Sequence, residues 1–192
     1  LHKKEENFMH WRNTHQRYGL TSIALHRVMA ILVIGLFALG KYMITLDYYH
    51  SLYLALPEWH RGLGVLTALL LAARLLWRWS NPLPDLSGRS WEKPLARLVH
   101  RLFYVLLLAI VVSGYLISTA DGHALQVFGW FDIPALISGA NLEDRAGAVH
   151  YFLTWLLAFM LALHVAGALK HQFIDKDAIF TRMLGFAPGQ RN

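Results

Sequence analysis

Four long apolar stretches dominate this sequence of 192 residues and limit what it can fold into. They cover about residues 22–45, 59–79, 94–118 and 146–174. A helix needs about 20 mainly apolar residues to cross the hydrocarbon core of a bilayer, and each stretch is near or above that length. Because backbone polar groups must be satisfied internally in lipid, we expect four transmembrane helices. The predicted fold class is all-α, an integral membrane four-helix bundle.

The distribution of basic residues predicts how the bundle is oriented. Lysines and arginines occur before the first apolar stretch, between the second and third, and in the tail, whereas residues 46–58 and 119–144 have none. Loops rich in these residues stay in the cytoplasm, so both termini are predicted to be cytoplasmic. The net charge of +6 therefore reflects loops that flank a membrane, and nucleic acid is not expected as a partner.

The same pattern divides the chain into three regions. We expect a cytoplasmic leader at residues 1–21, a membrane domain at 22–174 and a cytoplasmic tail at 175–192. The long loop at 119–144 is too polar to span a bilayer, but it contains Phe128, Trp130 and Phe131. Aromatic side chains favour the membrane interface, so this loop is predicted to pack across the outer face and cap the bundle.

Six histidines lie within the apolar stretches, and the last of them, His171, stands near the end of the fourth stretch. Polar side chains at membrane depth are costly and by default mark a functional site that faces the bundle interior. With the predicted topology, His26, His100 and His164 fall at the cytoplasmic level, and His60 and His150 fall at the outer level. The histidines therefore form two levels across the membrane.

A step of 14 residues links the two levels on each helix. On an α-helix this step returns to within about 40° of the same face after about 21 Å of rise. Glycine lets a large flat group approach the backbone, and arginine can bind a carboxylate through two hydrogen bonds. A porphyrin with two propionates fits this pattern, which predicts two stacked haems held by histidines. The pairs at this spacing are His26 with Gly40, His60 with Arg74, His100 with Gly114, and His150 with His164.

Histidines in membrane helices can also serve two roles that do not involve haem. They can form polar contacts between helices, in which glycines are also common. They can serve metal transport, but that function usually uses carboxylates or thiolates along a path. The sequence has no cysteine, and residues 22–45, 62–79 and 146–172 have no acidic residue. The repeated register favours haem over both of these roles.

Several short motifs carry a family resemblance. They are SIALHRVMA, PEWHRGLG, ARLLWR, ARLVHRLFYVLLLAI, SGYLI and LHVAGALKHQFIDKD. Through these motifs the chain resembles the bacterial cytochrome b561 family from about Arg17 to Met183. The resemblance implies a multi-pass protein of the bacterial inner membrane with two haem b groups.

The resemblance also implies the iron ligands. His26 and His164 would ligate the cytoplasmic haem, and His60 and His150 the outer haem. The spacing alone leaves the cytoplasmic pair open, because His100 lies at the same depth. We interpret His100 as a supporting group, near a propionate or hydrogen-bonded to a neighbouring helix.

The implied function is electron exchange between ubiquinone on the cytoplasmic side and a periplasmic redox partner or superoxide on the other. His171 matches the position that the family uses near quinone, and it lies seven residues beyond His164 on roughly the same helical stripe. Lys170 and Arg74 are further candidates there. Such a protein would act as a quinone-linked oxidoreductase. The alternatives are a cytochrome b subunit that anchors a larger redox complex and a non-redox metal transporter.

Overall fold

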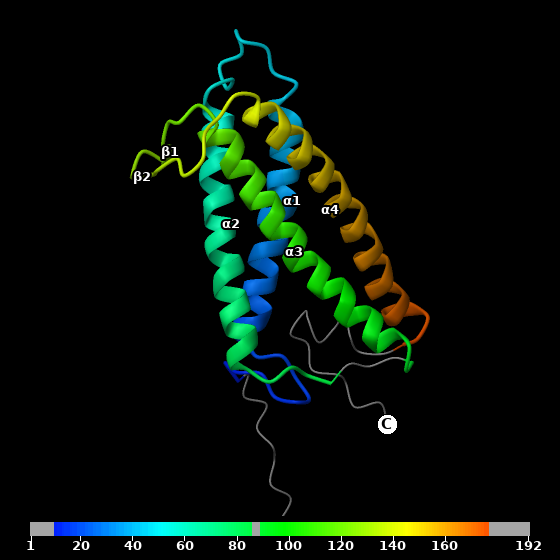
Figure 1. Ribbon diagram of the computed structural model, residues 1–192. Helices are drawn as coiled ribbons and strands as arrows, with labels where there is room; N and C mark the ends of the chain where they lie inside the picture. The colour runs from blue at the N-terminus through cyan, green and yellow to red at the C-terminus, as the bar shows by residue number, and fades with distance from the viewer. Residues whose placement is uncertain (1–9, 86–88, 177–192) are drawn as a thin grey trace, which may run out of the picture.

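The computed structural model describes residues 10–85 and 89–176 and contains four long helices (Figure 1). Each helix is long and apolar enough to cross a membrane, as the sequence predicted. In chain order they are α1 (Leu20–Met43), α2 (Ala55–Ser80), α3 (Glu92–Thr119) and α4 (Leu142–Phe173). The four-helix membrane fold is therefore confirmed.

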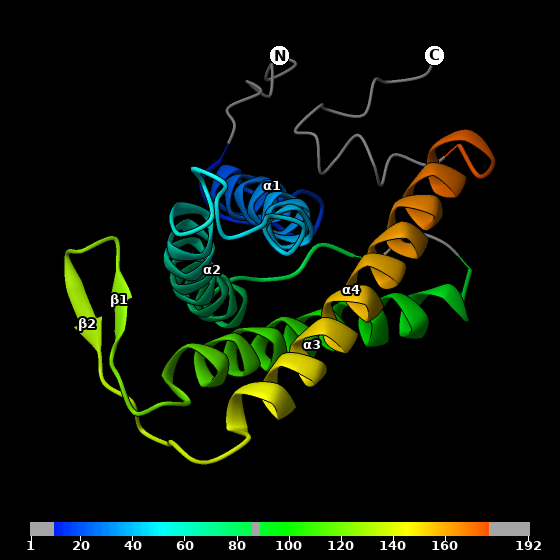
Figure 2. The same ribbon diagram turned by 90° about the horizontal axis from the view of Figure 1, so that it is seen from above.

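The helices are arranged as two pairs. Figure 2 shows α1 alongside α2, and α4 crossing α3. Contacts between α2 and α3 join the two pairs. Side chains of all four helices can therefore meet where the pairs face each other.

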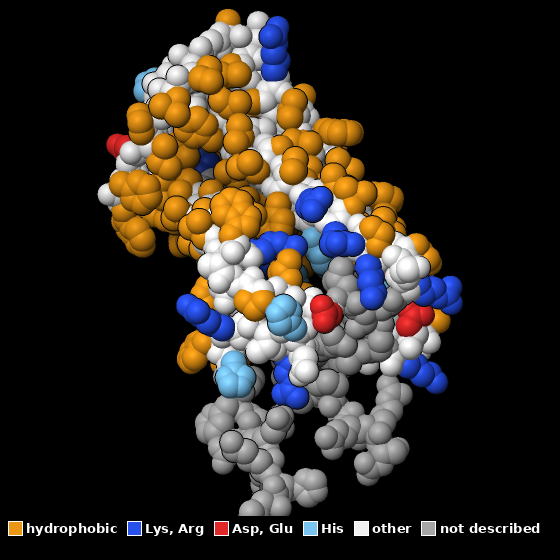
Figure 3. All heavy atoms as spheres, turned by 60° about the horizontal axis from the view of Figure 1, so that its bottom comes forward, with side chains coloured by type: hydrophobic (Ala, Val, Ile, Leu, Met, Phe, Trp, Pro, Cys, Tyr) orange, Lys and Arg blue, Asp and Glu red, His pale blue; other side chains and the backbone are white. Residues whose placement is uncertain are grey.

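The two ends of the bundle differ in charge. Both ends of the described chain lie at the same end of the bundle, which we call the inner end (Figure 1). Figure 3 shows lysine and arginine side chains gathered there, with hydrophobic side chains covering the helices beyond. This asymmetry agrees with an inner end that faces the cytoplasm, and the opposite end is called the outer end below.

The bundle is apolar both inside and outside. Each helix contributes a buried apolar residue to the interior, namely Met29, Leu71, Leu106 and Leu157. Each helix also leaves large apolar side chains exposed on its outside, among them Ile31, Leu69, Val105 and Phe159. A helix that is apolar on all sides is typical of a membrane span, where lipid covers the exposed face.

The helices extend beyond the apolar stretches from which they were predicted. α2 begins at Ala55 instead of residue 59, and α4 begins at Leu142 instead of residue 146. Glu143 and Asp144 occupy the first turn of α4, where carboxylates interact favourably with the positive end of the helix dipole. A hydropathy pattern omits such polar turns because they lie outside the lipid.

The leader packs against the inner end of the bundle. The Asn13 side chain accepts hydrogen bonds from the backbone N–H of Gly19 at 2.9 Å and from Ser22 Oγ at 2.7 Å. Its Nδ2 donates to the carbonyl oxygen of Pro82 at 3.0 Å. This buried asparagine therefore ties the leader to α1 and to the segment after α2. Most of the predicted tail, residues 177–192, lies outside the described residues.

The loop between α3 and α4 contains a short antiparallel hairpin of β1 (Leu125–Val127) and β2 (Phe131–Ile133). The strands pair Leu125 with Ile133, and β1 contacts α2 and α3 near the outer end (Figure 1). The described fold is thus all-α apart from this hairpin. Strands of three residues are too short for alternation to reveal them in a sequence, so only a cap was expected here.

Candidate functional site

Two histidines face each other near the outer end of the bundle. The ring centroids of His60 on α2 and His150 on α4 lie 6.3 Å apart, with an interplanar angle of 75°. A metal–imidazole bond measures about 2 Å, so this separation has room for one metal ion bound by both rings. The structure therefore brings together the two histidines predicted at the outer level.

The predicted glycines lie directly against these two imidazoles. A Cβ added at Gly40 would lie 3.1 Å from Cε1 of His60, and one added at Gly114 would lie 3.3 Å from Cε1 of His150. Both distances are tighter than ordinary contacts, so a larger residue would push the rings. Gly40 on α1 and Gly114 on α3 thus set how closely these helices approach the histidines.

Hydrogen bonds fix the orientation of the His150 ring. Its Nδ1 lies 3.0 Å from the carbonyl oxygen of Ile110 and 3.1 Å from Ser113 Oγ. A carbonyl oxygen can only accept, so Nδ1 carries the hydrogen and Nε2 keeps its lone pair. A histidine that ligates a metal commonly holds its other nitrogen in this way. His60 differs, because its buried Nδ1 has no hydrogen-bond partner among the described residues.

A cavity of about 410 Å³ lies between the two histidines and the middle of the bundle. All four helices and both strands of the hairpin line it, and apart from the histidines its walls are almost entirely apolar. Arg61, next to His60, is the lining residue with a permanent charge. The midpoints of the four 14-residue steps also line the cavity, namely Val33, Thr67, Leu107 and Leu157.

Three histidines meet near the inner end. The rings of His100 on α3 and His164 on α4 have centroids 5.6 Å apart. The Phe103 ring packs edge-on against His164 at 5.3 Å. His26 on α1 lies within electrostatic range of both histidines. The structure thus brings together all three candidates for the inner level, and it does not separate them into ligand and supporting group.

Arg74 belongs to the same inner group. It lies within electrostatic range of His26, His100 and His164, and its Nε donates to the hydroxyl of Tyr104 at 3.1 Å. Its Nη1 is buried and has no hydrogen-bond partner among the described residues. An unsatisfied buried guanidinium nitrogen is costly, so a bound carboxylate would fit this position.

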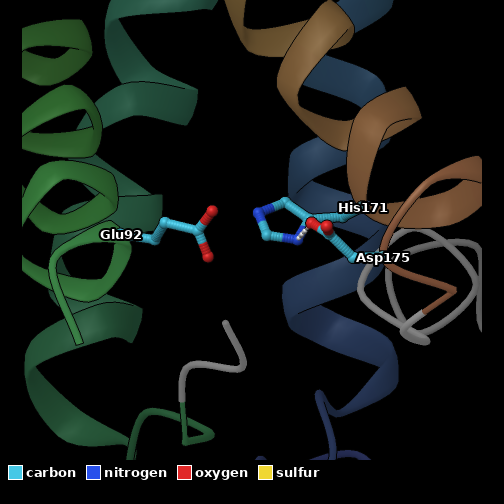
Figure 4. A group of neighbouring side chains, drawn as sticks. All are labelled: Glu92, His171 and Asp175. Carbon is cyan, nitrogen blue, oxygen red and sulfur yellow. Dashed lines mark ion pairs between the residues drawn. The ribbon is translucent and has the colours of Figure 1, made fainter. Parts of the chain in front are cut away.

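The inner end of α4 carries a charged cluster made of Glu92, Lys170, His171 and Asp175. Lys170 Nζ lies 2.6 Å from Glu92 Oε1 and 2.8 Å from Asp175 Oδ2. His171 Nδ1 lies 2.9 Å from Asp175 Oδ2, and the carboxylate of Glu92 is turned toward the His171 ring (Figure 4). The His171 side chain is 18% exposed, which is far less than an ordinary solvated histidine in a tail.

Sequence reasoning missed several of these partners. Ser113 and Tyr104 gave no signal beyond being polar residues in an apolar helix. Glu92 was not singled out, because its contact with Lys170 joins residues 78 positions apart. The signal that could have identified Glu92 is an acidic residue at the start of a transmembrane helix.

The fold and the facing histidines define the class: a multi-pass membrane protein that can hold metal-centred prosthetic groups within its bundle. The sequence profile of prokaryotic cytochrome b561 matches residues 17–186. The chain belongs to this family, and is therefore a membrane electron-transfer cytochrome of the haem b type. The predicted resemblance is confirmed.

Individual relatives agree over nearly the whole chain. Cytochrome b561 homolog 2 of Escherichia coli K12 is 47% identical over 180 residues, which cover 92% of this chain and 96% of the relative. Cytochrome b561 homolog 1 of the same organism is 25% identical over 88% of this chain and 97% of the relative. A Yersinia pestis protein named probable superoxide oxidase CybB is 24% identical over 88% of this chain and 97% of its own length.

Proposed function

We propose that this chain holds two b-type haems and carries electrons across the bacterial inner membrane. Ubiquinone would react at the inner, cytoplasmic end, and a periplasmic redox partner or superoxide at the outer end. Residues 22–174 would form the haem-binding domain, flanked by the leader and the tail. The observation that carries the proposal is the pair of facing histidine rings at the outer level, together with the group of three histidines at the inner level.

At the outer level we assign His60 and His150 as the axial ligands. The Nδ1 hydrogen bond of His150 leaves its Nε2 available, and the buried Nδ1 of His60 has no other partner among the described residues. Buried polar atoms without partners call for a missing ligand or ion, and coordination to iron would satisfy this one. Gly40 and Gly114 keep the backbone close to the rings, so the residues present fit a flat macrocycle.

At the inner level we assign His26 and His164 as the ligands, and His100 as a supporting group. The outer pair, His60 and His150, joins the α1–α2 pair of helices to the α3–α4 pair. His26 and His164 join the two pairs in the same way, whereas His100 and His164 lie on adjoining helices of one pair. A porphyrin that lies between the two pairs of helices would therefore be ligated by His26 rather than by His100. Arg74 would bind a propionate through its unsatisfied Nη1.

Each haem, when bound, supplies a one-electron change at its iron. The residues of the chain would determine where in the membrane each haem lies and how much water reaches it. His150 and His164 lie about 21 Å apart along the axis of α4, so the imidazoles would hold the two haems at two different depths. The apolar walls of the cavity limit water around the outer site. Together these residues would place one redox site near each membrane surface.

Reduction of a quinone requires protons as well as electrons. His171 lies about 10 Å along α4 from His164, so it would lie beside the inner haem and would not ligate its iron. An imidazole N–H can donate a hydrogen bond, so His171 could bind a quinone carbonyl and pass a proton to it. Asp175 would orient the ring through its bond to Nδ1. The neighbouring Lys170 is held by Glu92 and Asp175 and is thus less available to a ligand.

Purified protein tests this proposal directly. A reduced-minus-oxidised spectrum of the chain in detergent should show b-type bands. Mixing the reduced protein with a soluble ubiquinone in a stopped-flow instrument should reoxidise both haems. A colourless chain would contradict the haem assignment, and a coloured chain that quinone does not oxidise would contradict the quinone assignment.

A further inference from the structure

We propose that the β1–β2 hairpin is the outer wall of the outer haem site, and that Phe128 holds this wall closed by packing against Gly62. The inference rests on the proposed haem between His60 and His150. It assigns the hairpin a role in setting the redox potential of that haem. Phe128 is a positioning residue, because it acts through the wall and not on the haem itself.

The hairpin forms part of the cavity that contains the two outer histidines. Leu125 and Ile133 are partners across the strands, and both line the cavity together with His60 and His150. Leu125 is 5% exposed and Val127 is 3% exposed, so β1 turns an apolar face toward the bundle. One face of the hairpin therefore lines the cavity, and in our proposal it would separate the outer haem from the aqueous side.

Phe128 sits at the tip of the hairpin and packs onto α2. Its ring covers Gly62 so closely that a Cβ added to this glycine would collide with the ring. Trp59 packs edge-on against it, with ring centroids 5.3 Å apart. Gly62 is buried and lies two residues from His60. The tip is thus attached to the helix that carries an outer ligand.

The backbone of Phe128 adopts a conformation that phenylalanine rarely takes. Phe128 has φ 52° and Gly129 has φ 70°, and Trp130 N donates to the carbonyl oxygen of Val127 at 2.9 Å. Turns with positive φ at both central positions favour asparagine, aspartate or glycine at the first of them. A bulky residue there persists only when its surroundings compensate for the strain, and such strain clusters at functional sites. The packing on Gly62 provides that compensation.

The other side of the hairpin is fastened independently. The hydroxyl of Tyr115 on α3 donates to the carbonyl oxygen of Pro134 at 2.7 Å and accepts from the N–H of Leu136 at 2.8 Å. These bonds hold the segment that follows β2. The Phe128 ring joins the tip to α2, and β1 contacts the same helix. Removing the ring should therefore loosen the tip without detaching the whole loop.

Closing the wall has a definite electrostatic consequence. A haem ligated by two histidines carries an extra positive charge when its iron is ferric, and water stabilises that charge. Solvent exposure is one of the factors that set the potential of such a centre. Excluding water from the outer site should therefore raise the potential of the outer haem.

Two substitutions test the wall on the purified protein with its haems bound. Phe128→Gly removes the ring and relieves the backbone strain, and Gly62→Ala places a methyl group under the ring. Both should shift the midpoint potential of the outer haem downward in a spectroelectrochemical titration, with the inner haem unchanged. Gly147→Ala is the matched control, because an added Cβ there meets nothing within 4 Å. It should leave both potentials unchanged.

Hydrogen exchange on the same samples gives a readout that does not depend on electron transfer. Amides of the hairpin should exchange faster in both variants than in the wild type and the control. His150→Ala is measured first to identify the signal of the outer haem; if it keeps both haem signals, the proposed haem site fails. Loss of one haem signal from His150→Ala is instead the result that the proposed haem site predicts. In that case, an unchanged midpoint potential of the outer haem in both Phe128→Gly and Gly62→Ala would contradict the role of the hairpin alone, whatever the exchange rates.

Discussion

The Nδ1 atom of His150 lies 3.0 Å from the carbonyl oxygen of Ile110, and this contact links the α4 histidine to the backbone of α3. It fixes both the tautomer and the orientation of the ring before any ligand is bound. A histidine held in this way would need little rearrangement to coordinate iron, since its hydrogen-bond partner already orients the ring. The outer site is thus built by the crossing of α3 and α4 as well as by the facing histidine of α2.

Replacing single histidines should remove one haem at a time. His150→Ala should abolish the outer haem and His164→Ala the inner one, because each leaves an axial position empty. Haem content per chain, measured on purified variants, should fall by about half in both cases. His123→Ala is a suitable control, since this exposed histidine pairs with Asp121 in the outer loop and should leave haem content unchanged. Loss of both haems from either variant, with the fold intact, would show that the two sites are not separate.

The choice between His26 and His100 can be decided in the same assay. His26→Ala should lose the inner haem, because it removes the ligand that joins α1 to α4. His100→Ala should retain the haem, with an altered spectrum or potential at most. If His100→Ala loses the inner haem while His26→Ala keeps it, the assignment of the inner ligands is wrong.

Adding a methyl group at Gly40 should disturb the outer site. The new Cβ would lie 3.1 Å from Cε1 of His60, so the ring or the helix must move. Overpacking of this kind typically costs about 1–3 kcal/mol. We expect Gly40→Ala to lower both the occupancy of the outer haem and the thermal stability of the protein. Gly35→Ala on the same helix, where an added Cβ meets nothing within 4 Å, should change neither.

Removing the charge of Arg74 should lower the potential of the inner haem. A nearby cation favours the ferrous state, which carries less positive charge than the ferric state, so Arg74→Gln should make this haem harder to reduce. A redox titration that resolves the two haems measures the effect. The outer haem serves as the internal reference, and an equal shift in both potentials would argue against a local role for Arg74.

His171→Ala should keep both haem signals but slow electron exchange with ubiquinone. Asp175→Asn should cause a smaller loss of rate, because it weakens the orientation of the His171 ring without removing it. Stopped-flow mixing of each reduced variant with a soluble ubiquinone checks both expectations, and Asp121→Asn in the outer loop provides a control with the same chemical change. Wild-type kinetics in His171→Ala would rule out this residue as the quinone site.

The sequence allowed the helices and the two histidine levels to be predicted because both follow from short-range periodicity. Hydropathy identified the four spans, and the 14-residue step placed Gly40 and Gly114 at the level where the structure has them beside His60 and His150. The same step put Arg74 at the level of the inner histidines. These features need only the rise and twist of a helix.

Contacts between distant segments could not be predicted in this way. The packing of Phe128 on Gly62 joins residues 66 positions apart and depends on a turn with positive φ at a phenylalanine. The bond between Lys170 and Glu92 depends on how α3 and α4 cross. Helical periodicity fixes which residues share a face of one helix, but it does not fix how two helices approach each other.

All of the proposed electron-transfer chemistry depends on one chain holding two haems, one at each histidine level. A pyridine-haemochrome assay on purified protein of known concentration measures this number directly. We expect about two b-type haems per chain. A value near one would contradict the pairing of both levels, and a value near zero would contradict the assignment of any of these histidines as haem ligands.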